Sequence, residues 1–375
     1  MKPYEVIIIG CGASGAASAF HLAKAGWQVS VVEKKSRNDF KRLCGGGMAS
    51  SVQELFPFNL SPVIEEVINK VHFTWCLEDK VEANLPGKSP FWIVNREKLD
   101  NLILEMAIKE GAELHHDFDV VNIHKEDSLW HVISNKGNHL TSKIIVIANG
   151  STSHWPRSFG LGPKNEHRAL TTSVRLEGKG NLQKGTSRFE FGLVSNGFAW
   201  AFPMSNEVNV GIGTFIGNNQ NNSEKILDQF LPSLGFSKNE GKRKNTFLRV
   251  WNGHYKLHDQ GVVITGDAAS LCDPFLAEGL RPALMSGCIA ANCINQHLKG
   301  DTRDLSNYSK IIKLKWGDSM AWGNRIAQVF YRFPKIGYQL GIKRPTAPQR
   351  IAEILSGKLG YGDIANRSIR RLIFK

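Results

Sequence analysis

Residues 4–33 read YEVIIIGCGASGAASAFHLAKAGWQVSVVE. The β-branched run at residues 4–9 is typical of a parallel strand that is buried on both faces. A glycine-rich turn follows at once, small residues favour a helix over residues 16–25, and residues 27–32 predict a second strand that ends at Glu33. Because a strand, a tight turn, a helix and a second strand make up one βαβ unit, we expect a Rossmann-type α/β fold.

The turn has the spacing GxGxxG, in which each glycine has a physical role. Gly10 allows the tight turn, Gly12 lets the backbone approach a pyrophosphate, and Gly15 lets the helix pack closely on the strand. The helix N-terminus offers free N–H groups to the diphosphate, and the acid that ends the second strand accepts hydrogen bonds from a ribose. The residues that this pattern predicts to bind a dinucleotide are Gly10, Gly12, Ala13, Ser14, Gly15, Glu33 and Lys34.

The length of 375 residues predicts two domains, or one domain with large insertions. Strand patterns dominate residues 168–250 and predict an antiparallel sheet inserted into the α/β fold. Since no second fingerprint of this kind occurs in the chain, FAD is favoured over NAD as the dinucleotide. We expect a discontinuous FAD-binding domain at residues 1–60, 96–160 and 259–300. An antiparallel β substrate domain is expected at residues 61–95 and 161–258. A basic helical region is expected at residues 301–375.

The composition excludes several classes of protein. An apolar fraction of 42% and a charged fraction of 22% argue against a disordered, collagen-like or fibrous chain. No apolar stretch reaches the ~18–20 residues of a membrane-spanning helix, and no cleavage-site pattern follows the apolar start. The six isolated cysteines are typical of a reducing compartment and predict neither a disulfide framework nor a zinc site. We therefore expect a cytoplasmic protein without a bound metal.

The net charge of +13 is unevenly distributed. Residues 301–375 hold fifteen Lys and Arg against five Asp and Glu, an excess of +10. Such a segment fits an anionic lipid surface, nucleic acid, an acidic protein partner or a diphosphate substrate, and it also fits a solvated helical surface. Charge alone leaves these alternatives open.

Four patches of the sequence resemble the geranylgeranyl reductases, a family of FAD-dependent enzymes within the aromatic-hydroxylase-like flavoproteins. They are LCGGGM at residues 43–48, FAWAFP at 198–203, GDAA at 266–269 continuing through DPF at 273–275 and EG at 278–279, and ILSG at 354–357 followed by Tyr361. The resemblance runs nearly end to end. One departure is Asn149-Gly150, where related flavin hydroxylases carry Asp-Gly.

The resemblance implies further FAD-binding residues. They are Cys44, Gly45, Gly46, Arg96, Gly266, Asp267, Glu278, Gly279 and Leu280. Asp267 would bind the ribityl or phosphate part of FAD, and the helix opened by residues 278–280 would point its N-terminus at the flavin. The alternatives are that Asp267 caps a helix, that Glu278 is a local helix charge, and that Arg96 is a solvated first-turn residue.

The implied reaction is the saturation of isolated double bonds in a prenyl chain, by hydride from reduced flavin and by a proton from the protein. Cys44, on its glycine loop, is the candidate proton donor; the alternative is that it only packs on the flavin. Phe198, Trp200 and Phe202 share one face of a strand and could bind the prenyl chain, although an aromatic stripe is also typical of ordinary core.

The electrons would come from NADPH or from a small acidic carrier such as reduced ferredoxin. Peripheral contact with an anionic membrane is a further expectation, because aromatic residues alternate with Lys and Arg in the C-terminal region. These residues are Trp316, Trp322, Phe330, Tyr331, Phe333 and Tyr338. Two rival functions are a flavin monooxygenase of a quinone or other aromatic, and a non-redox flavoprotein such as a carotenoid cyclase. No nucleic-acid partner is expected, since no RNA-binding module is recognised.

Overall fold

The strand predicted at residues 4–9 lies in the middle of an eight-stranded sheet. The computed structural model describes residues 2–36, 44–88, 90–216 and 222–364. The sheet runs in the order β17-β18-β11-β1-β2-β8, and β10 and β9 continue from β11. β1 pairs in parallel with β2 and β11, and its four Val and Ile side chains are buried. Its strands are β1 (Tyr4–Ile9), β2 (Val29–Val32), β8 (Glu113–His115), β9 (Val120–Glu126), β10 (Leu129–Ser134), β11 (His139–Ile147), β17 (His258–Asp259) and β18 (Val262–Ile264).

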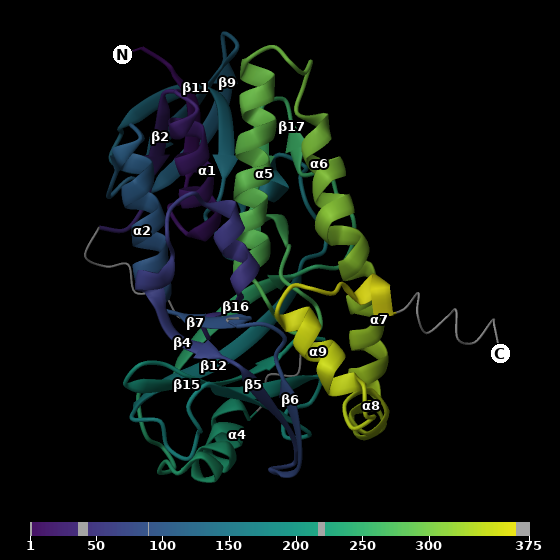
Figure 1. The fold of residues 1–375 in the computed structure, drawn as a ribbon. Helices are drawn as coiled ribbons and strands as arrows, with labels where there is room; N and C mark the ends of the chain where they lie inside the picture. The colour runs from purple at the N-terminus through teal and green to yellow at the C-terminus, as the bar shows by residue number, and fades with distance from the viewer. Residues whose placement is uncertain (1, 37–43, 89, 217–221, 365–375) are drawn as a thin grey trace, which may run out of the picture.

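Three helices cover this sheet, namely α1 (Ala13–Lys24), α2 (Arg96–Lys109) and α5 (Leu280–Leu298) (Figure 1). α1 packs between the other two, and its Ser18 hydroxyl donates to the Gly287 carbonyl of α5 at 3.0 Å. The helix predicted to open at residues 278–280 begins at Leu280, because Ala277 has a φ of +56° and the chain is not yet helical there. Glu278 and Gly279 therefore lie in a loop before α5.

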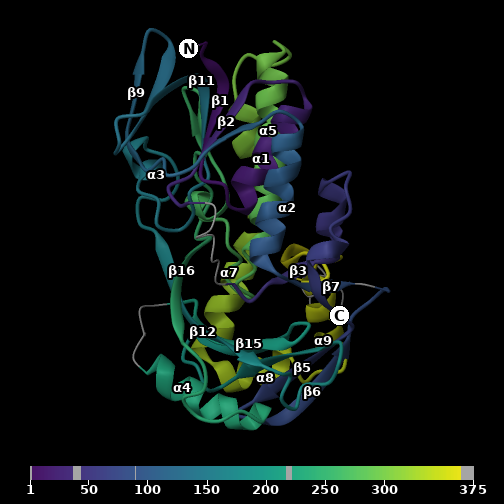
Figure 2. The ribbon, with the colours of Figure 1, turned by 90° about the vertical axis from the view of Figure 1, so that its left-hand side faces the viewer.

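A seven-stranded sheet lies at the opposite end of the molecule (Figure 2). Its order is β16-β12-β15-β14-β13-β5-β6, and every pair is antiparallel except β13 with β5. A smaller sheet, β3-β7-β4, stands beside it. The strands are β3 (Gly47–Ala49), β4 (Ile64–Ile68), β5 (Lys70–Trp75), β6 (Glu78–Asn84), β7 (Phe91–Val94), β12 (His167–Glu177), β13 (Thr186–Phe191), β14 (Gly197–Pro203), β15 (Glu207–Thr214) and β16 (Lys244–Val250). The short helices are η2 (Ser50–Leu55), η3 (Ser61–Val63), α3 (Trp155–Ser158), α4 (Ser223–Phe230), η4 (Leu231–Leu234) and η5 (Gly266–Ala269).

The C-terminal helices run along one side of the molecule from the first sheet to the second (Figure 1). They are α6 (Ser306–Ile312), the π-helical turn η6 (Lys313–Gly317), α7 (Asp318–Arg332), α8 (Pro334–Gly341) and α9 (Ala347–Leu355). Within the described residues, no helix is both long and apolar enough to cross a membrane. Residues 365–375 of the basic region lie outside the described residues. Residue 43 of the LCGGGM stretch does so too.

Most of the aromatic residues expected at a membrane surface are instead part of the core. Trp316, Phe330, Tyr331 and Tyr338 are buried. Trp316 Nε1 donates to the Leu271 carbonyl at 2.8 Å, and the Tyr331 hydroxyl donates to the Phe275 carbonyl at 2.7 Å. These side chains dock the C-terminal helices on the rest of the protein, so the interfacial interpretation was wrong for them.

Candidate active site

The backbone is tightly packed at the glycine turn between β1 and α1. Gly10 has a φ of +97°, and a Cβ added there would lie 2.8 Å from the Ala148 carbonyl oxygen of the neighbouring strand end. A Cβ on Gly15 would overlap the Gly10 carbonyl oxygen. The N-cap residue Gly12 makes no side-chain cap, and the first turn of α1 contains no acid. The N-terminus of α1 is therefore free to receive an anionic group.

Glu33 lies where β2 ends and is almost fully buried. Its carboxylate accepts hydrogen bonds from the backbone N–H of Cys11 and from that of Lys35, each at 3.2 Å. These bonds hold the carboxylate against the glycine turn. The acid at the end of the second strand thus lies beside the fingerprint, as the βαβ pattern predicts.

One cavity of about 590 Å³ connects the glycine turn with the seven-stranded sheet. Every residue predicted to bind cofactor or substrate lines it except Gly15 and Gly266. Gly15 packs behind the turn, and the Gly266 N–H donates to Ser286 Oγ of α5 at 2.9 Å. The predicted residues on the cavity wall are Gly10, Gly12, Ala13, Ser14, Glu33, Lys34, Cys44, Gly45, Gly46, Arg96, Phe198, Trp200, Phe202, Asp267, Glu278, Gly279 and Leu280.

The Cys-Gly-Gly loop lies directly on the aromatic strand β14. A Cβ added to Gly45 would meet the Phe202 ring at 3.1 Å and Trp200 Nε1 at 3.3 Å. Trp200 Nε1 donates to Asn209 Oδ1 at 2.8 Å, and Asn209 Nδ2 donates to the Cys44 carbonyl at 3.4 Å. Asn209 therefore ties the loop to the aromatic wall, although Cys44 and Trp200 are 156 residues apart in the sequence.

Arg96 is not a solvated first-turn residue. Its guanidinium forms an ion pair with Asp100 at 3.1 Å, and only 17% of its side chain is exposed. Burial disfavours its charge, but Asp100 and the hydrogen-bonded side chain of Cys44 raise the pKa of Arg96 above its usual value. The Cys44 thiol also accepts the Gly46 N–H at 3.4 Å. A permanent positive charge thus lies next to the Cys44 sulfur at the cavity wall.

Two acids face the cavity from the segment around α5. Burial raises the pKa of Asp267 to about 6, although Arg96 and Arg249 oppose the shift. Burial also raises the pKa of Glu278 to about 6, although its ion pair with Arg281, at 2.7 Å, opposes the shift. Asp267 follows β18 and lies at the carboxyl edge of the parallel strands, where ligands bind in this fold class.

The buried Asp267 carboxyl makes the stability of the apoprotein depend on pH. The folded protein holds this proton up to about pH 6, whereas the unfolded chain loses it near pH 3.8, the ordinary pKa of an aspartate. The folded state therefore binds more protons in this window and loses stability as the pH rises through it. We expect Asp267→Asn to stabilise the apoprotein by about 2–3 kcal/mol at about pH 8 and not at about pH 4.

Urea unfolding of both apoproteins at the two pH values measures this difference. Asp301→Asn, at an exposed aspartate, is the control and should change the free energy of unfolding little at either pH. An equal gain at both pH values for Asp267→Asn would show that titration of this carboxyl is not the cause.

Sequence reasoning missed several residues of this site. Asp100 and Asn209 hold Arg96 and the Cys44 loop, and neither lies in a motif. The buried Arg249 donates to the Ser151 carbonyl at 2.7 Å and to that of Ser153, so it clamps a loop of the cavity wall. A further set of wall residues comes from the strands of the second sheet and from the residue after β15: Thr171, Phe189, Phe215, Thr246, Phe247 and Leu248.

The DPF stretch and Tyr361 belong to one buried hydrogen-bonded unit. Asp273 accepts the N–H groups of Phe275 and Leu276 at 2.7 and 2.9 Å, and it accepts the Tyr361 hydroxyl at 2.7 Å. The ring of Tyr361 is buried. Two of the four motif patches are therefore in direct contact, and they shape the loop that carries Glu278.

The cavity fits an FAD molecule by several independent features. The glycine turn packs tightly on its own backbone and on the neighbouring strand end, and the N-terminus of α1 beside it has neither a side-chain cap nor an acid in its first turn. Asn149 Oδ1, on the cavity wall, is buried and has no hydrogen-bond partner within the described residues. A ligand that donates a hydrogen bond would satisfy this atom. The Asn149 amide thus faces the cavity at the position where related flavin hydroxylases carry Asp.

Comparisons with known proteins agree with this geometry. A family model described as FAD dependent oxidoreductase matches residues 5–39. An uncharacterized protein of Methanosarcina barkeri is 27% identical over 305 residues, which cover 81% of this chain and 78% of that protein. The digeranylgeranylglycerophospholipid reductase of Methanococcus vannielii is 25% identical over 312 residues, covering 77% and 76%.

Among solved structures, a geranylgeranyl bacteriochlorophyll reductase-like protein of Thermoplasma acidophilum superimposes with a TM-score of 0.79 at 20% identity. The superposition covers 96% of this chain and 93% of that protein. This likeness confirms the predicted fold class. The named relatives confirm the predicted resemblance to FAD-dependent geranylgeranyl reductases.

Proposed function

We propose that this chain, an FAD-dependent oxidoreductase related to the geranylgeranyl reductases, reduces isolated C=C bonds of a geranylgeranyl-type prenyl chain. The observation that carries the proposal is that one cavity has the glycine turn at one end and an aromatic wall at the other. Cys44 lines the same cavity, and its loop contacts the aromatic wall. Such a cavity suits a long apolar substrate next to a flavin ring.

An isolated double bond is a poor hydride acceptor, so a well-placed acid must assist its reduction. Bound reduced FAD would supply the hydride to one olefinic carbon. The Cys44 thiol would donate a proton to the other carbon, and its glycine neighbours allow it to approach the substrate closely. The Arg96 guanidinium, hydrogen-bonded to the Cys44 side chain, would stabilise the thiolate that remains.

The aromatic wall would align the prenyl chain and exclude water. Phe198, Trp200 and Phe202 are buried on one strand, and Trp200 is fixed by its hydrogen bond to Asn209. Because this bond satisfies the indole N–H, the ring offers an apolar face to the cavity. Phe189 and Phe215 extend the same apolar surface.

Anaerobic incubation of the FAD-loaded protein with dithionite and geranylgeranyl diphosphate tests the proposal by mass spectrometry. We expect products that have gained hydrogen in pairs. A product hydroxylated only when oxygen and NADPH are present would instead support a monooxygenase, and a product of unchanged mass would support a cyclase. Parallel assays that replace dithionite by NADPH or by reduced ferredoxin identify the class of electron donor.

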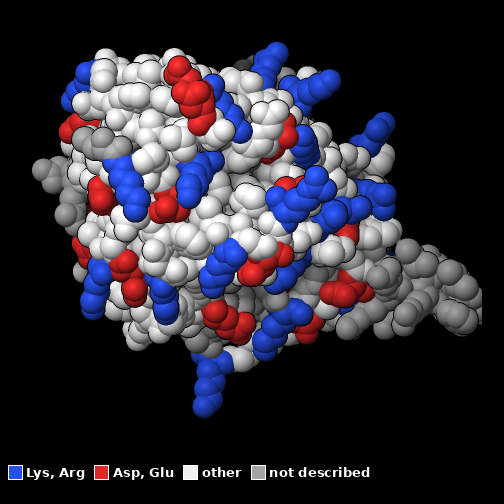
Figure 3. All heavy atoms as spheres, turned by 90° about the horizontal axis from the view of Figure 1, so that it is seen from above, with Lys and Arg blue, Asp and Glu red and all other residues white. Residues whose placement is uncertain are grey.

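We also propose that the protein is cytoplasmic and binds peripherally to an anionic membrane, where prenyl lipids reside. Four large apolar side chains on α7 and α8 are more than half exposed, and they are Val329, Phe333, Ile336 and Leu340. Val329 lies in the last turn of α7, Phe333 at the break between the two helices, and Ile336 and Leu340 one turn apart on α8. Exposed Arg332 and Lys335 stand among them, so apolar contact and charge attraction would act together. By contrast, Lys and Arg are interspersed with Asp and Glu on the face seen in Figure 3.

Replacing both Phe333 and Leu340 by serine is expected to weaken binding to anionic vesicles at least about 100-fold. Each apolar side chain contributes about 1.5–3 kcal/mol when it is buried in the interface. Vesicle flotation measures the partition. Val121→Ser, at an apolar residue that is 55% exposed on β9, is the matched control and should leave binding unchanged. Equal flotation of the double variant and the wild type would exclude this face.

A further inference from the structure

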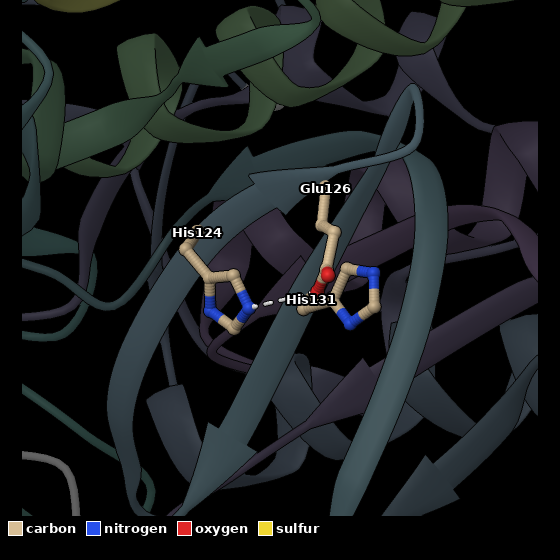
Figure 4. A group of neighbouring side chains, drawn as sticks. All are labelled: His124, Glu126 and His131. Carbon is tan, nitrogen blue, oxygen red and sulfur yellow. Dashed lines mark ion pairs between the residues drawn. The ribbon is translucent and has the colours of Figure 1, made fainter.

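A cluster of histidines lies on the outer face of the meander β9-β10-β11. His131 is the direct cross-strand partner of His124 in the antiparallel pair β9/β10. Glu126 lies two residues beyond His124 and therefore on the same face of its strand. His139 projects from β11 beside His131, as their ring contact shows. Three strands thus bring four side chains of metal-binding types to one patch of the surface. Figure 4 shows three of them, His124, Glu126 and His131.

The side chains of His124, Glu126 and His131 point toward one another (Figure 4). One ligand atom from each lies within 4.8 Å of the others, and His124 Nε2 lies 3.8 Å from a Glu126 carboxylate oxygen. The rings of His124 and His131 are stacked with their centroids 5.0 Å apart. A tetrahedral metal with bonds of about 2.1 Å needs ligand atoms about 3.4 Å apart. Side chains at the surface can close this gap by rotation.

A histidine that binds a metal normally donates its other ring N–H to a neighbouring group, and His139 can accept this hydrogen bond from His131. His131 Nδ1 and His139 Nε2 are 2.8 Å apart, so one of them donates a proton to the other. With the proton on His131 Nδ1, its Nε2 keeps a lone pair for a metal and its ring orientation is fixed. His139 then acts as a positioning residue rather than a ligand.

We propose that His124, Glu126 and His131 bind a divalent metal of the zinc class, with His139 orienting His131. Two imidazoles and one carboxylate form a ligand set that suits Zn²⁺, and a water molecule would complete the tetrahedron. The cysteines, from which no zinc site was predicted, take no part. This proposal does not rest on the proposed reaction.

The metal would join β9 to β10 and, through His139, to β11. Two of these strands reach the cavity at their other ends, because Val120 of β9 and Ala148, the residue after β11, line its wall. Because the metal binds the folded protein, it stabilises the meander that carries this wall. We therefore expect saturating Zn²⁺ to raise the melting temperature of the FAD-loaded protein, and a chelator to reverse this shift.

The test uses the untagged full-length protein, loaded with FAD and freed of metal by a chelator. Zn²⁺ is titrated in competition with a chromophoric chelator, and Co²⁺ is added separately to detect the visible bands of a tetrahedral site. We expect His124→Gln and His131→Gln to weaken binding more than about 100-fold, and His139→Gln to weaken it about 10–100-fold. Retained FAD absorbance shows that each variant is folded.

His254→Gln is the matched control, because His254 also stands next to an acid, Asp318 at 3.4 Å, but outside the cluster. It should bind Zn²⁺ as the wild type does. Wild-type binding no tighter than that of His131→Gln would overturn the proposal, as would a Co²⁺ spectrum that is the same in both proteins. Either result would mean that the cluster is an ordinary group of surface side chains.

Discussion

Gly15→Ala is expected to lower the affinity for FAD at least about 100-fold. The added methyl group would overlap the Gly10 carbonyl oxygen, which is backbone and cannot rotate away. Either α1 or the glycine turn must then shift, and the turn loses its fit to the diphosphate. Overpacking of this kind costs about 3 kcal/mol, which corresponds to about 100-fold in a binding constant. Titration of the apoprotein with FAD, followed by flavin fluorescence, measures the affinity.

Gly341→Ala controls for the loss of a glycine in a helix. A Cβ at this position would meet only the Phe330 ring, at an ordinary 3.8 Å. The control should bind FAD as the wild type does, and circular dichroism should show that both variants retain their helices. If Gly15→Ala binds FAD within a few-fold of the wild type, the turn is not the diphosphate site.

Cys44→Ala is expected to lower the turnover of a prenyl substrate about 10²–10⁴-fold, the usual contribution of a general acid. FAD should remain bound, because the other wall residues of the cavity are unchanged. The effect should fall on the protonation step. A solvent deuterium isotope effect on wild-type turnover should therefore change in the variant.

The half-buried Cys288, on α5 and outside the cavity wall, offers the matched control Cys288→Ala. It removes a thiol without touching the proposed chemistry and should leave turnover unchanged. Turnover of Cys44→Ala within two-fold of the wild type would remove Cys44 from the mechanism, while the reductase proposal itself would stand. An Arg96→Gln variant adds a second check, because we expect it to slow turnover with Cys44 intact.

The sequence predicted most buried elements and missed exposed ones. Buried strands such as β1 and β14 were predicted because their residues are apolar and β-branched or aromatic. Strands β4 and β6 lie at sheet edges and were missed because charged residues interrupt the apolar pattern of their sequences, IEEVI and EDKVEAN. β8 and β9 are separate strands, since the chain turns between them at Asp117, which has a φ of +52°.

The C-terminal region shows why composition alone misplaced side chains. Aromatic residues among Lys and Arg suggested a membrane surface, yet the Tyr331 hydroxyl and the Trp316 indole N–H bond to buried carbonyl groups. The exposed apolar side chains are mainly aliphatic, with Phe333 the one aromatic residue among those proposed for membrane contact. Which side of a helix faces the core depends on how that helix docks, and this information is spread over the whole fold.

The dinucleotide turn could be recognised without any structure because its chemistry is local. Gly10, Gly15 and Glu33 lie within a single βαβ unit, and chain connectivity alone brings them together. The meeting of Cys44 with Asn209, and of His124 with His131 and His139, follows instead from strand register and from the docking of one sheet against a distant loop. A change of one residue in register would turn these side chains to the opposite face. Tertiary packing therefore sets the proposed acid and the proposed metal site.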